Sequence, residues 1–480
     1  MDTKKRNIVI ALMLAMFLAA MEGTIVTMAT PTIVADLQGF ELISLVFSVY
    51  LLTSAISTPV YGKLSDLYGR KNVLSIGITI FLIGCLLCGL AQSMTFLIVS
   101  RAIQGLGAGA IFTISYTIVG DLFPFEKRAK VQGALGTVWG ISSLIGPFFG
   151  GVLIDLFSWH WIFFINIPFG LLSIIILQKT LVENFERKKH SIDYAGIFTL
   201  ATAILVFLNI FLSTGSTNTN QLAFIFGSIA MTTALLFLFY KIEKNAQEPI
   251  MPFDIFTKSS TFVNGISFFA SAVLVGISVY MPLFMQNVLG FSATVSGLAM
   301  LPMSASWLIM SFILGRFLVR YGGKKVLIAS STMMLISAIL LLTLGTGSSL
   351  VLVLIYLFII GFAFGGAFTT LTIIVQDSVE QNKRGTAVAV NSLLRSLGQT
   401  IGISIFGGMF NLYIAKYFIQ LGIEDVNSSN LYQITTITNE QIQLSLHSSL
   451  HVLFIVFVLI SALALIASVY MPKFNGQKAN

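Results

Sequence analysis

Charged residues are scarce in this chain, and their scarcity indicates its class. Only 10% of the 480 residues are Asp, Glu, Lys or Arg, whereas 56% are hydrophobic. A water-soluble fold needs a polar surface that this composition does not provide, so an ordinary soluble protein is excluded. No polar stretch between the apolar segments is long enough for a soluble domain. We therefore expect an all-α polytopic membrane protein.

Cysteine and histidine are nearly absent, which argues against metal and nucleophile chemistry. The two cysteines, Cys85 and Cys88, lack a second pair of ligands, so we expect them to pack in the interior. The four histidines have no carboxylate cluster beside them, and no GxxxxGKS or GxxxxGKT phosphate-binding loop occurs. We therefore expect no metal, no bound cofactor, no enzymatic activity and no coupling to ATP hydrolysis within this chain.

The net charge of +8 is spread between the apolar segments, which argues against a nucleic-acid partner. If the N-terminus is cytoplasmic, all Lys and Arg residues except Arg101, Arg395 and Lys416 fall in cytoplasmic loops and tails, as the positive-inside rule requires. This alternation predicts an even number of spans with both termini inside. The first apolar segment lacks a small-residue cleavage site, so we expect a retained helix and not a signal peptide.

Apolar runs of ~20 residues, the length that crosses a bilayer, recur along the chain. They predict fourteen transmembrane helices, at residues 8–28, 42–62, 74–91, 96–119, 131–154, 162–179, 193–213, 222–241, 261–283, 292–318, 325–345, 349–375, 385–416 and 448–471. The stretch between the last two, residues 417–447, is polar and is expected to be an outer loop.

Two loop sequences recur in the same order. GKLSDLYGRK (Gly62–Lys71) is matched 253 residues later by GRFLVRYGGK (Gly315–Lys324), and DLFPFEKR (Asp121–Arg128) is matched 256 residues later by DSVEQNKR (Asp377–Arg384). A duplicated six-helix unit explains both matches. Such parallel repeats form a pseudo-symmetric carrier whose site lies between the halves.

The repeat predicts a three-part organisation. Residues 1–180 form an N-terminal six-helix bundle, residues 181–258 hold two extra helices and linkers, and residues 259–480 form a C-terminal six-helix bundle. The extra helices, at 193–241, have no counterpart in the other half.

Several motifs together resemble the major facilitator superfamily, and in particular its fourteen-helix drug:proton antiporters, similar to Gram-positive bacterial members. They are MEGTIVTMATP (21–31), GKLSDLYGRK (62–71), RAIQGLGAG (101–109), GISSLIGPFFGG (140–151), WHWIFFINIPFG (159–170) and NSLLRSLGQTIG (391–402). In the first motif Glu22 stands where this family usually has Asp. The resemblance implies protons as the coupling ion.

The loop at 62–71 has the chemistry of a latch. Gly62 and Gly69 allow a tight reversal, and Asp66 can contact Arg70 or a helix N-terminus. Lys71 completes the basic end of the motif. The alternative is a solvated loop that only sets topology. The resemblance implies a latch that breaks when the carrier turns inward, and a one-sided latch because Val319 replaces the acid in the second copy.

Predicted helix 5 contains an unusual number of helix breakers: Gly136, Gly140, Gly146, Pro147, Gly150 and Gly151. Small residues at a spacing of four allow close helix packing, and Gly-Pro allows a bend. Simple tight packing is the alternative. The resemblance implies that this helix seals the outer side of an antiporter.

Few ionisable groups are expected inside the membrane, where each is costly and therefore a candidate functional residue. Of the 19 acids only Glu22 lies well inside a predicted helix, reachable through a water-filled cavity. It can hold a proton or a cation, which is the basis of exchange. The alternative is a permanent ion pair with Arg101 or Arg395. Asp155 and Asp193 lie at predicted helix ends and are weaker candidates, expected to be interfacial or capping residues.

The leading hypothesis is a monomeric proton-coupled exporter of lipophilic, cationic drugs in the cytoplasmic membrane. A drug site is expected to be large and apolar, and the candidate lining residues are Tyr50, Trp139, Tyr280, Gln286 and Asn391. The alternative is export of a specific metabolite, lipid or siderophore by the same machinery. A membrane-embedded enzyme or receptor would need a catalytic cluster or a loop domain, and the sequence shows neither.

Overall fold

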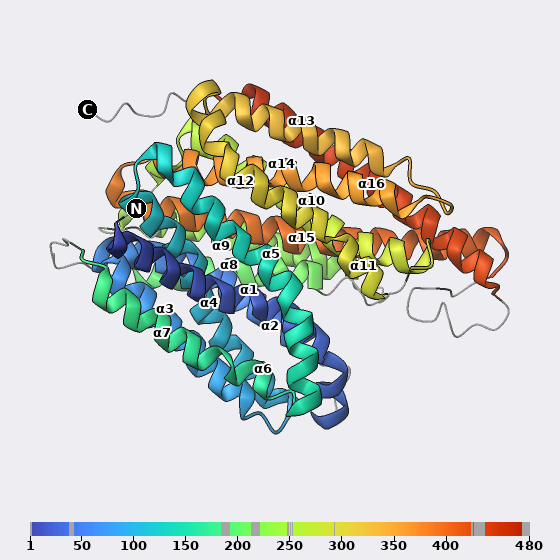
Figure 1. Cartoon of the computed structure of the whole chain (residues 1–480), viewed down its shortest axis with the longest axis horizontal. Helices are drawn as coiled ribbons and strands as arrows, with labels where there is room; N and C mark the ends of the chain where they lie inside the picture. The colour runs from blue at the N-terminus through green and yellow to red at the C-terminus, as the bar shows by residue number, and fades with distance from the viewer. Residues whose placement is uncertain are drawn as a thin grey trace.

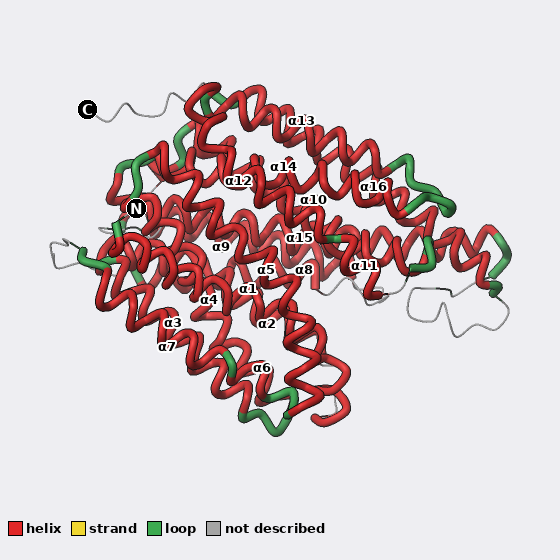
Figure 2. Tube along the Cα trace, viewed as in Figure 1, coloured by secondary structure: helices red, strands yellow, loops and turns green. Residues whose placement is uncertain are grey.

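The computed structural model describes residues 2–37, 43–183, 193–212, 221–246, 249, 251, 253–291, 293–423, 426 and 437–472. Within these ranges the chain forms helices joined by turns and contains no strand (Figure 2). Eleven helices of the described part are long and apolar enough to cross a membrane. An all-α polytopic fold is therefore confirmed, while the count of fourteen spans stays a prediction.

A first bundle is formed by helices that pack mainly on one another. Its pairs include α3 with α4 and α7, α1 with α5 and α7, and α2 with α4. The bounds are α1 (Thr3–Leu37), α2 (Ile43–Tyr68), α3 (Arg70–Gly89), α4 (Met94–Leu122), α5 (Phe125–Leu156), α6 (Trp161–Phe164) and α7 (Asn166–Thr180).

A second bundle is formed by the helices from α10 onward, in which α10 packs on α15 and α16, and α14 packs on α12 and α13. The bounds are α10 (Lys258–Asn287), α11 (Ala293–Ala299), α12 (Leu301–Tyr321), α13 (Gly323–Leu341), α14 (Leu350–Asp377), α15 (Arg384–Gln420) and α16 (Asn439–Tyr470). Two short 3-10 turns, η2 (Phe253–Ile255) and η3 (Gln381–Lys383), precede α10 and α15.

Two further helices, α8 (Tyr194–Leu212) and α9 (Gln221–Asn245), pack on each other, and α8 also contacts α2 and α15. Leu200 and Ile204 of α8 share an apolar cluster with Ala55 of α2 and Val390 of α15. The α8–α9 pair therefore covers a seam between the two bundles.

Several predicted helix boundaries were wrong. The predicted helices at 162–179 and 292–318 each remain one apolar span, Trp161–Thr180 and Val295–Tyr321, but a turn at Ile165 separates α6 from α7 and a turn at Met300 separates α11 from α12. The predicted outer loop 417–447 is partly helical, because α15 runs to Gln420 and α16 begins at Asn439. The side chains of Thr438 and Gln441 form a capping box there, which hydropathy alone does not reveal.

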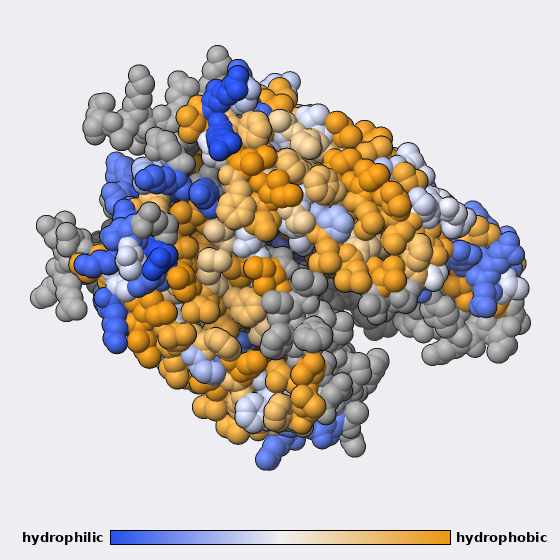
Figure 3. Space-filling model, in the orientation of Figure 1, coloured by the Kyte–Doolittle hydropathy of each residue, from blue (hydrophilic) through white to orange (hydrophobic). Residues whose placement is uncertain are grey.

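The two bundles meet most closely at one end of the molecule, where α2, α4 and α14 end and α5 and α15 begin. We call this end the charged side, because Asp66, Asp121, Arg128, Asp377 and Arg384 lie there. It lies toward the left of Figure 1, and the helices of the two bundles spread apart toward the right. Figure 3 shows an orange apolar flank between the blue patches at the ends, as a bilayer-embedded protein requires.

Candidate functional site

Glu22 of α1 is completely buried and lies against Arg101 of α4, which is 1% exposed. The Arg101 Nη1 donates to Glu22 Oε1 at 2.6 Å and also to Gln104 Oε1 at 2.6 Å, while its Nε donates to the Val46 carbonyl oxygen at 3.1 Å. The guanidinium group also stands 4.2 Å above the Tyr50 ring. In this conformation Glu22 forms the ion pair with Arg101 that sequence analysis gave as the alternative to a free proton-binding site. Arg395, the other candidate partner, does not contact Glu22.

Two amides complete the surroundings of the ion pair. Asn166, at the start of α7, donates to Glu22 Oε2 at 3.1 Å, and this explains the polar residue within the apolar WHWIFFINIPFG motif. Gln104 donates to Cys85 Sγ at 3.0 Å. Cys85 and Cys88 are buried free thiols, which confirms their expected place in the interior.

The geometry around Glu22 satisfies an ionised carboxylate without water. Both carboxylate oxygens have donors, and the side chain is completely buried in this conformation, so access through a water-filled cavity stays a prediction. A buried ion pair is retained only when its partners satisfy each other, since an uncompensated charge costs several kcal/mol. Protonation of Glu22 would remove its attraction for Arg101. The pair can therefore act as a switch whose state depends on one proton.

A second polar site lies between the bundles on the charged side. Asp66 Oδ1 accepts hydrogen bonds from Arg70 Nη2 at 2.9 Å and from the Gly385 N–H at 3.1 Å. Its Oδ2 accepts from the N–H and the hydroxyl of Thr386 at 2.9 and 3.0 Å. Asp66 thus contacts both predicted kinds of partner, and the helix N-terminus belongs to α15 of the other bundle.

Burial raises the pKa of Asp66 to about 6, although Arg70 and the donors of Thr386 and Gly385 act in the opposite direction. The carboxyl group is therefore ionised at neutral pH. Its charge lies at the N-terminus of α15, where the helix dipole favours an anion. The interaction consequently holds the first turn of α15 against the end of α2.

Only Gly69 forms the reversal between α2 and α3, with φ of 89°. The expectation that Gly62 also lies in the turn was wrong, because Gly62 is inside α2. A Cβ on Gly62 would lie 2.3 Å from Ala389 Cβ and 2.9 Å from the Gly385 oxygen. Glycine is needed there for close approach between bundles and not for backbone freedom.

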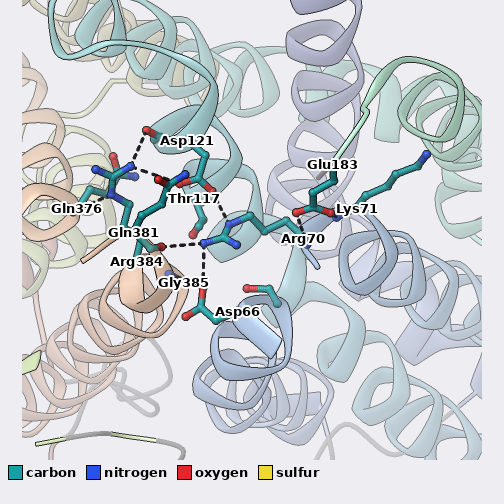
Figure 4. A network of polar contacts seen from close by, with 12 residues as sticks. Asp66, Arg70, Lys71, Thr117, Asp121, Glu183, Gln376, Gln381, Arg384 and Gly385 are labelled. Atoms are coloured by element: carbon teal, nitrogen blue, oxygen red, sulfur yellow. Dashed lines mark hydrogen bonds and ion pairs between the residues drawn. The ribbon is translucent and has the colours of Figure 1, made fainter. Parts of the chain in front are cut away.

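Arg70 connects Asp66 to the end of α4 and to η3 (Figure 4). Its Nε lies 2.5 Å from Asp121 Oδ2, and its Nη2 donates to the Gln381 carbonyl oxygen at 3.3 Å. Glu183 accepts from the backbone N–H groups of Arg70 at 2.8 Å and of Lys71 at 3.1 Å. Glu183 thus anchors the start of α3, a role that sequence analysis missed because no local pattern links residues so far apart.

The repeated DLFPFEKR and DSVEQNKR segments form reciprocal ion pairs across the bundles. Arg128 pairs with Asp377, while Arg384 Nη1 lies 3.4 Å from Asp121 Oδ1. Each pair joins the Arg of one copy to the Asp of the other. The recurrence of both Asp and Arg at the same positions of the two segments was the sequence feature that could have indicated these pairs. On the charged side, both halves therefore contribute an Asp and an Arg to the ion pairs between the bundles. The contact of Asp66, in contrast, has no equivalent in the second half.

An amide bridge lies next to these pairs. Gln132 of α5 donates to Gln376 Oε1 at 3.1 Å, and Gln376 Nε2 donates to the Tyr116 carbonyl oxygen at 2.8 Å. Gln132 and Gln376 are both buried. These contacts join α14 of the second bundle to α4 and α5 of the first.

Helix α5 is continuous through the predicted hinge. A Cβ on Gly150 would lie 2.8 Å from Ile25 of α1, so this glycine serves close packing. Gly136 is less tightly packed, since a Cβ there would lie 3.6 Å from Trp307 Nε1. Gly146 is buried, whereas the surroundings of Gly140, Pro147 and Gly151 lie outside the described residues. The hinge role stays a prediction.

The remaining acid candidates are only partly described. Asp193 Oδ1 accepts from the Gly196 N–H at 2.8 Å, which is a helix-capping contact at the start of α8, as expected. The side chain of Asp155 lies outside the described residues.

The predicted lining residues do not gather at one place. Tyr50 is buried under Arg101, Tyr280 is buried with its ring 5.6 Å from that of Phe410, and Gln286 is exposed near the end of α10. Asn391 is buried and donates to Asn264 Oδ1 at 2.9 Å and to Ser267 Oγ at 2.8 Å. The Trp139 side chain is outside the described part. Lining by these residues therefore stays a prediction.

The sequence is similar to known transport proteins along most of its length. "Multidrug resistance protein 3" of Bacillus subtilis (strain 168) is 37% identical over 402 residues, which cover 83% of this chain and 78% of that protein. "Multidrug efflux pump SdrM" of Staphylococcus aureus (strain N315) is 33% identical, with 88% of this chain and 92% of that protein covered.

Solved structures share the fold at low sequence identity. The human organic anion transporter MFSD10 (TETRAN) aligns with a TM-score of 0.69 and 13% identity over 98% of this chain and 100% of that chain. The proton:xylose symporter XylE aligns with a TM-score of 0.64 and 15% identity, over 98% and 96% of the two chains. The family description "Major Facilitator Superfamily" matches residues 12–403. This match, together with relatives above 30% identity along most of their length, shows that the chain belongs to the major facilitator superfamily.

Proposed function

We propose that this protein exports lipophilic, cationic drugs across the cytoplasmic membrane in exchange for protons. Relatives named multidrug resistance protein and multidrug efflux pump support drug export, and membership of a transporter family supports a role other than catalysis. The positive-inside rule supports a cytoplasmic location for the charged side and for both termini. The protein works as a monomer, with one site between two bundles.

The buried Glu22–Arg101 pair carries the proposal of proton coupling. A proton that reaches Glu22 from the outer side neutralises the carboxylate and releases Arg101, which keeps its contacts with Gln104 and the Val46 carbonyl oxygen. Deprotonation toward the cytoplasm restores the pair. Export follows if drug binding and proton binding favour opposite states of this pair.

The proposed moving parts are the N-terminal bundle at 1–180 and the C-terminal bundle at 259–480, with the two extra helices and linkers at 181–258 beside them. The polar network on the charged side supports a conformation that is closed toward the cytoplasm. Opening toward the cytoplasm requires loss of the Asp66 and reciprocal Arg–Asp contacts.

Transport by proteoliposomes tests the function directly. We expect purified protein to move a lipophilic fluorescent cation against its gradient when an imposed pH gradient supplies protons, and to release protons in detergent when the cation is added. Dissipating the pH gradient should stop transport. If the protein exports a metabolite, lipid or siderophore and no drug, the proposed substrate is wrong, but the proposed exchange for protons still applies.

Asp66→Asn is expected to slow drug export about tenfold with little change in drug affinity. The substitution removes the charge that faces the α15 N-terminus and weakens hydrogen bonds to a charged group, each worth ~1.5–3 kcal/mol. The affinity is kept because the residue lies on the charged side, in the contact between the ends of α2 and α15, and not among the expected drug-lining residues. Initial export rates and equilibrium binding of the same cation measure the two effects, and unchanged export would refute the latch.

Gly62→Ala is expected to disfavour the closed charged side about tenfold or more, because the new methyl group would overlap Ala389 and the Gly385 carbonyl. Labelling of a cysteine introduced near the network should then increase. Gly265→Ala is the matched control, since a Cβ at that α10 glycine would meet no atom within 4 Å. Equal labelling of the two variants would show that the bundles tolerate a wider separation.

A further inference from the structure

Arg395 is a half-buried cation, and no carboxylate of the described residues pairs with it. It lies in α15 eleven residues after Arg384, where that helix begins, which corresponds to about 16 Å along the helix. Arg395 therefore lies well inside the apolar helix Arg384–Gln420 and away from the charged side. Among the residues that the structure describes, no Asp or Glu forms an ion pair with it.

The hydrogen bonds of Arg395 use only one end of the guanidinium group. Its Nη2 donates to the Phe368 carbonyl oxygen at 3.1 Å and to Thr372 Oγ1 at 2.8 Å. Its Nε is buried with no acceptor, and Nη1 makes no hydrogen bond to a described residue. A guanidinium group has five N–H donors, so three of them remain available.

The helices around α15 do not supply the missing negative charge. It packs on α2, α4, α8, α10, α14 and α16. The acids on these helices lie at their ends: Asp66, Asp121 and Asp377 belong to the network on the charged side, and Glu440 is in the first turn of α16. Glu22 is already compensated by Arg101. With Glu22, Arg101 and Arg395 all ionised, the described part of the interior therefore carries one uncompensated positive charge.

Aromatic rings lie beside this charge at the boundary of the bundles. The guanidinium group stands 4.9 Å from the Phe368 ring, and Phe368 stacks on Trp307 with centroids 5.4 Å apart and planes at 10°. Trp307 of α12 is only half-buried and faces Gly136 of α5. The arrangement offers an apolar surface next to free N–H donors.

We propose that Arg395 binds the carboxylate of amphoteric drugs, meaning lipophilic cations that also carry an acid group. An unpaired half-buried cation is stabilised by an anion, and the planar guanidinium group matches a carboxylate in two-point hydrogen bonding. The aromatic part of the same molecule packs beside Trp307 and Phe368. This inference rests on the proposed drug export and adds a substrate class to it.

Arg395 would otherwise only connect α15 to α14 through Phe368 and Thr372. That structural role uses only the Nη2 group, and its loss would affect the binding of all substrates equally. A binding role predicts an effect confined to ligands with a carboxylate. The two roles are separated by two probes that differ in this group alone.

The experiment compares a rhodamine that has a free benzoate group with its ethyl ester; both carry the cationic ring system. Binding to the purified full chain in nanodiscs is followed by fluorescence anisotropy. We expect the wild type to prefer the benzoate form. Arg395→Gln should weaken benzoate binding at least tenfold, or ~1.4 kcal/mol, and change ester binding less than twofold. Arg395→Lys should keep part of the preference, because it retains the charge and loses the planar fork.

Arg316→Gln is the matched control, since this arginine is exposed on α12 and its loss lowers the net charge equally. It should leave the binding of both probes unchanged. Equal weakening of both probes by Arg395→Gln, or no weakening in a correctly folded variant, would overturn the binding role. If the ester binds but the benzoate group gives no advantage, the proposed drug transport stands and this inference fails. If neither probe binds the wild type, both proposals fail.

Discussion

Glu22→Gln is expected to abolish proton-linked drug export, with a loss of at least a hundredfold in the initial rate under an imposed pH gradient. The amide keeps the size of the side chain and an acceptor for Asn166, but it cannot exchange a proton. Arg101 then has no counter-charge, and leaving one partner of a buried pair alone costs ~3–5 kcal/mol. Proton release on drug addition, measured in weakly buffered detergent solution, should disappear.

Glu22→Asp separates the loss of titration from the loss of stability. Aspartate can still exchange a proton, although its shorter side chain reaches Arg101 less well, so we expect partial export. Gel filtration and thermal unfolding verify that each variant is folded. Wild-type coupling in a folded Glu22→Gln protein would assign the proton to another acid, with Asp155 and Asp193 the next candidates, and would leave Glu22 as a structural partner of Arg101.

Arg128→Gln and Asp377→Asn are each expected to reduce the population closed on the charged side about tenfold, because each leaves a largely buried charge without its partner across the bundles. The double substitution should cost less than the two effects added together, because the two residues pair with each other, although Asp377 also lies 3.8 Å from Arg384. Spin labels at Lys130 of α5 and Lys325 of α13, which are both exposed, report the separation of the bundles.

Two exposed residues outside the network provide a control substitution for each sign of charge. Arg316→Gln removes an exposed arginine and Glu440→Gln an exposed acid from places outside the network, and neither should alter the label distances. Additive effects of Arg128→Gln and Asp377→Asn would mean that these residues act separately. The reciprocal arrangement would then be a consequence of sequence duplication and not a connection between the halves.

The helical architecture followed from sequence because it depends on composition and periodic spacing. Apolar runs of spanning length need no tertiary information, since lipid excludes unsatisfied backbone groups wherever the run occurs. Boundaries were less accurate for a related reason. The start of α16 depends on the Thr438 capping box, and the division of α6 from α7 occurs within a continuous apolar run, so hydropathy records neither.

The sequence by itself determined that the chain is a membrane-embedded helical protein, that it contains a repeat, and that Glu22, Arg101 and Arg395 are the charges to examine. A charged residue inside an apolar helix can be recognised from the sequence alone, because it interrupts a run of hydrophobic residues. Only the tertiary structure decided the partners: Arg101 pairs with Glu22 and Arg395 does not. It also brought Asp66 to the first turn of α15 and Arg128 to Asp377, more than 200 residues away. Such contacts depend on how two bundles meet, and local propensity contains no information about that packing.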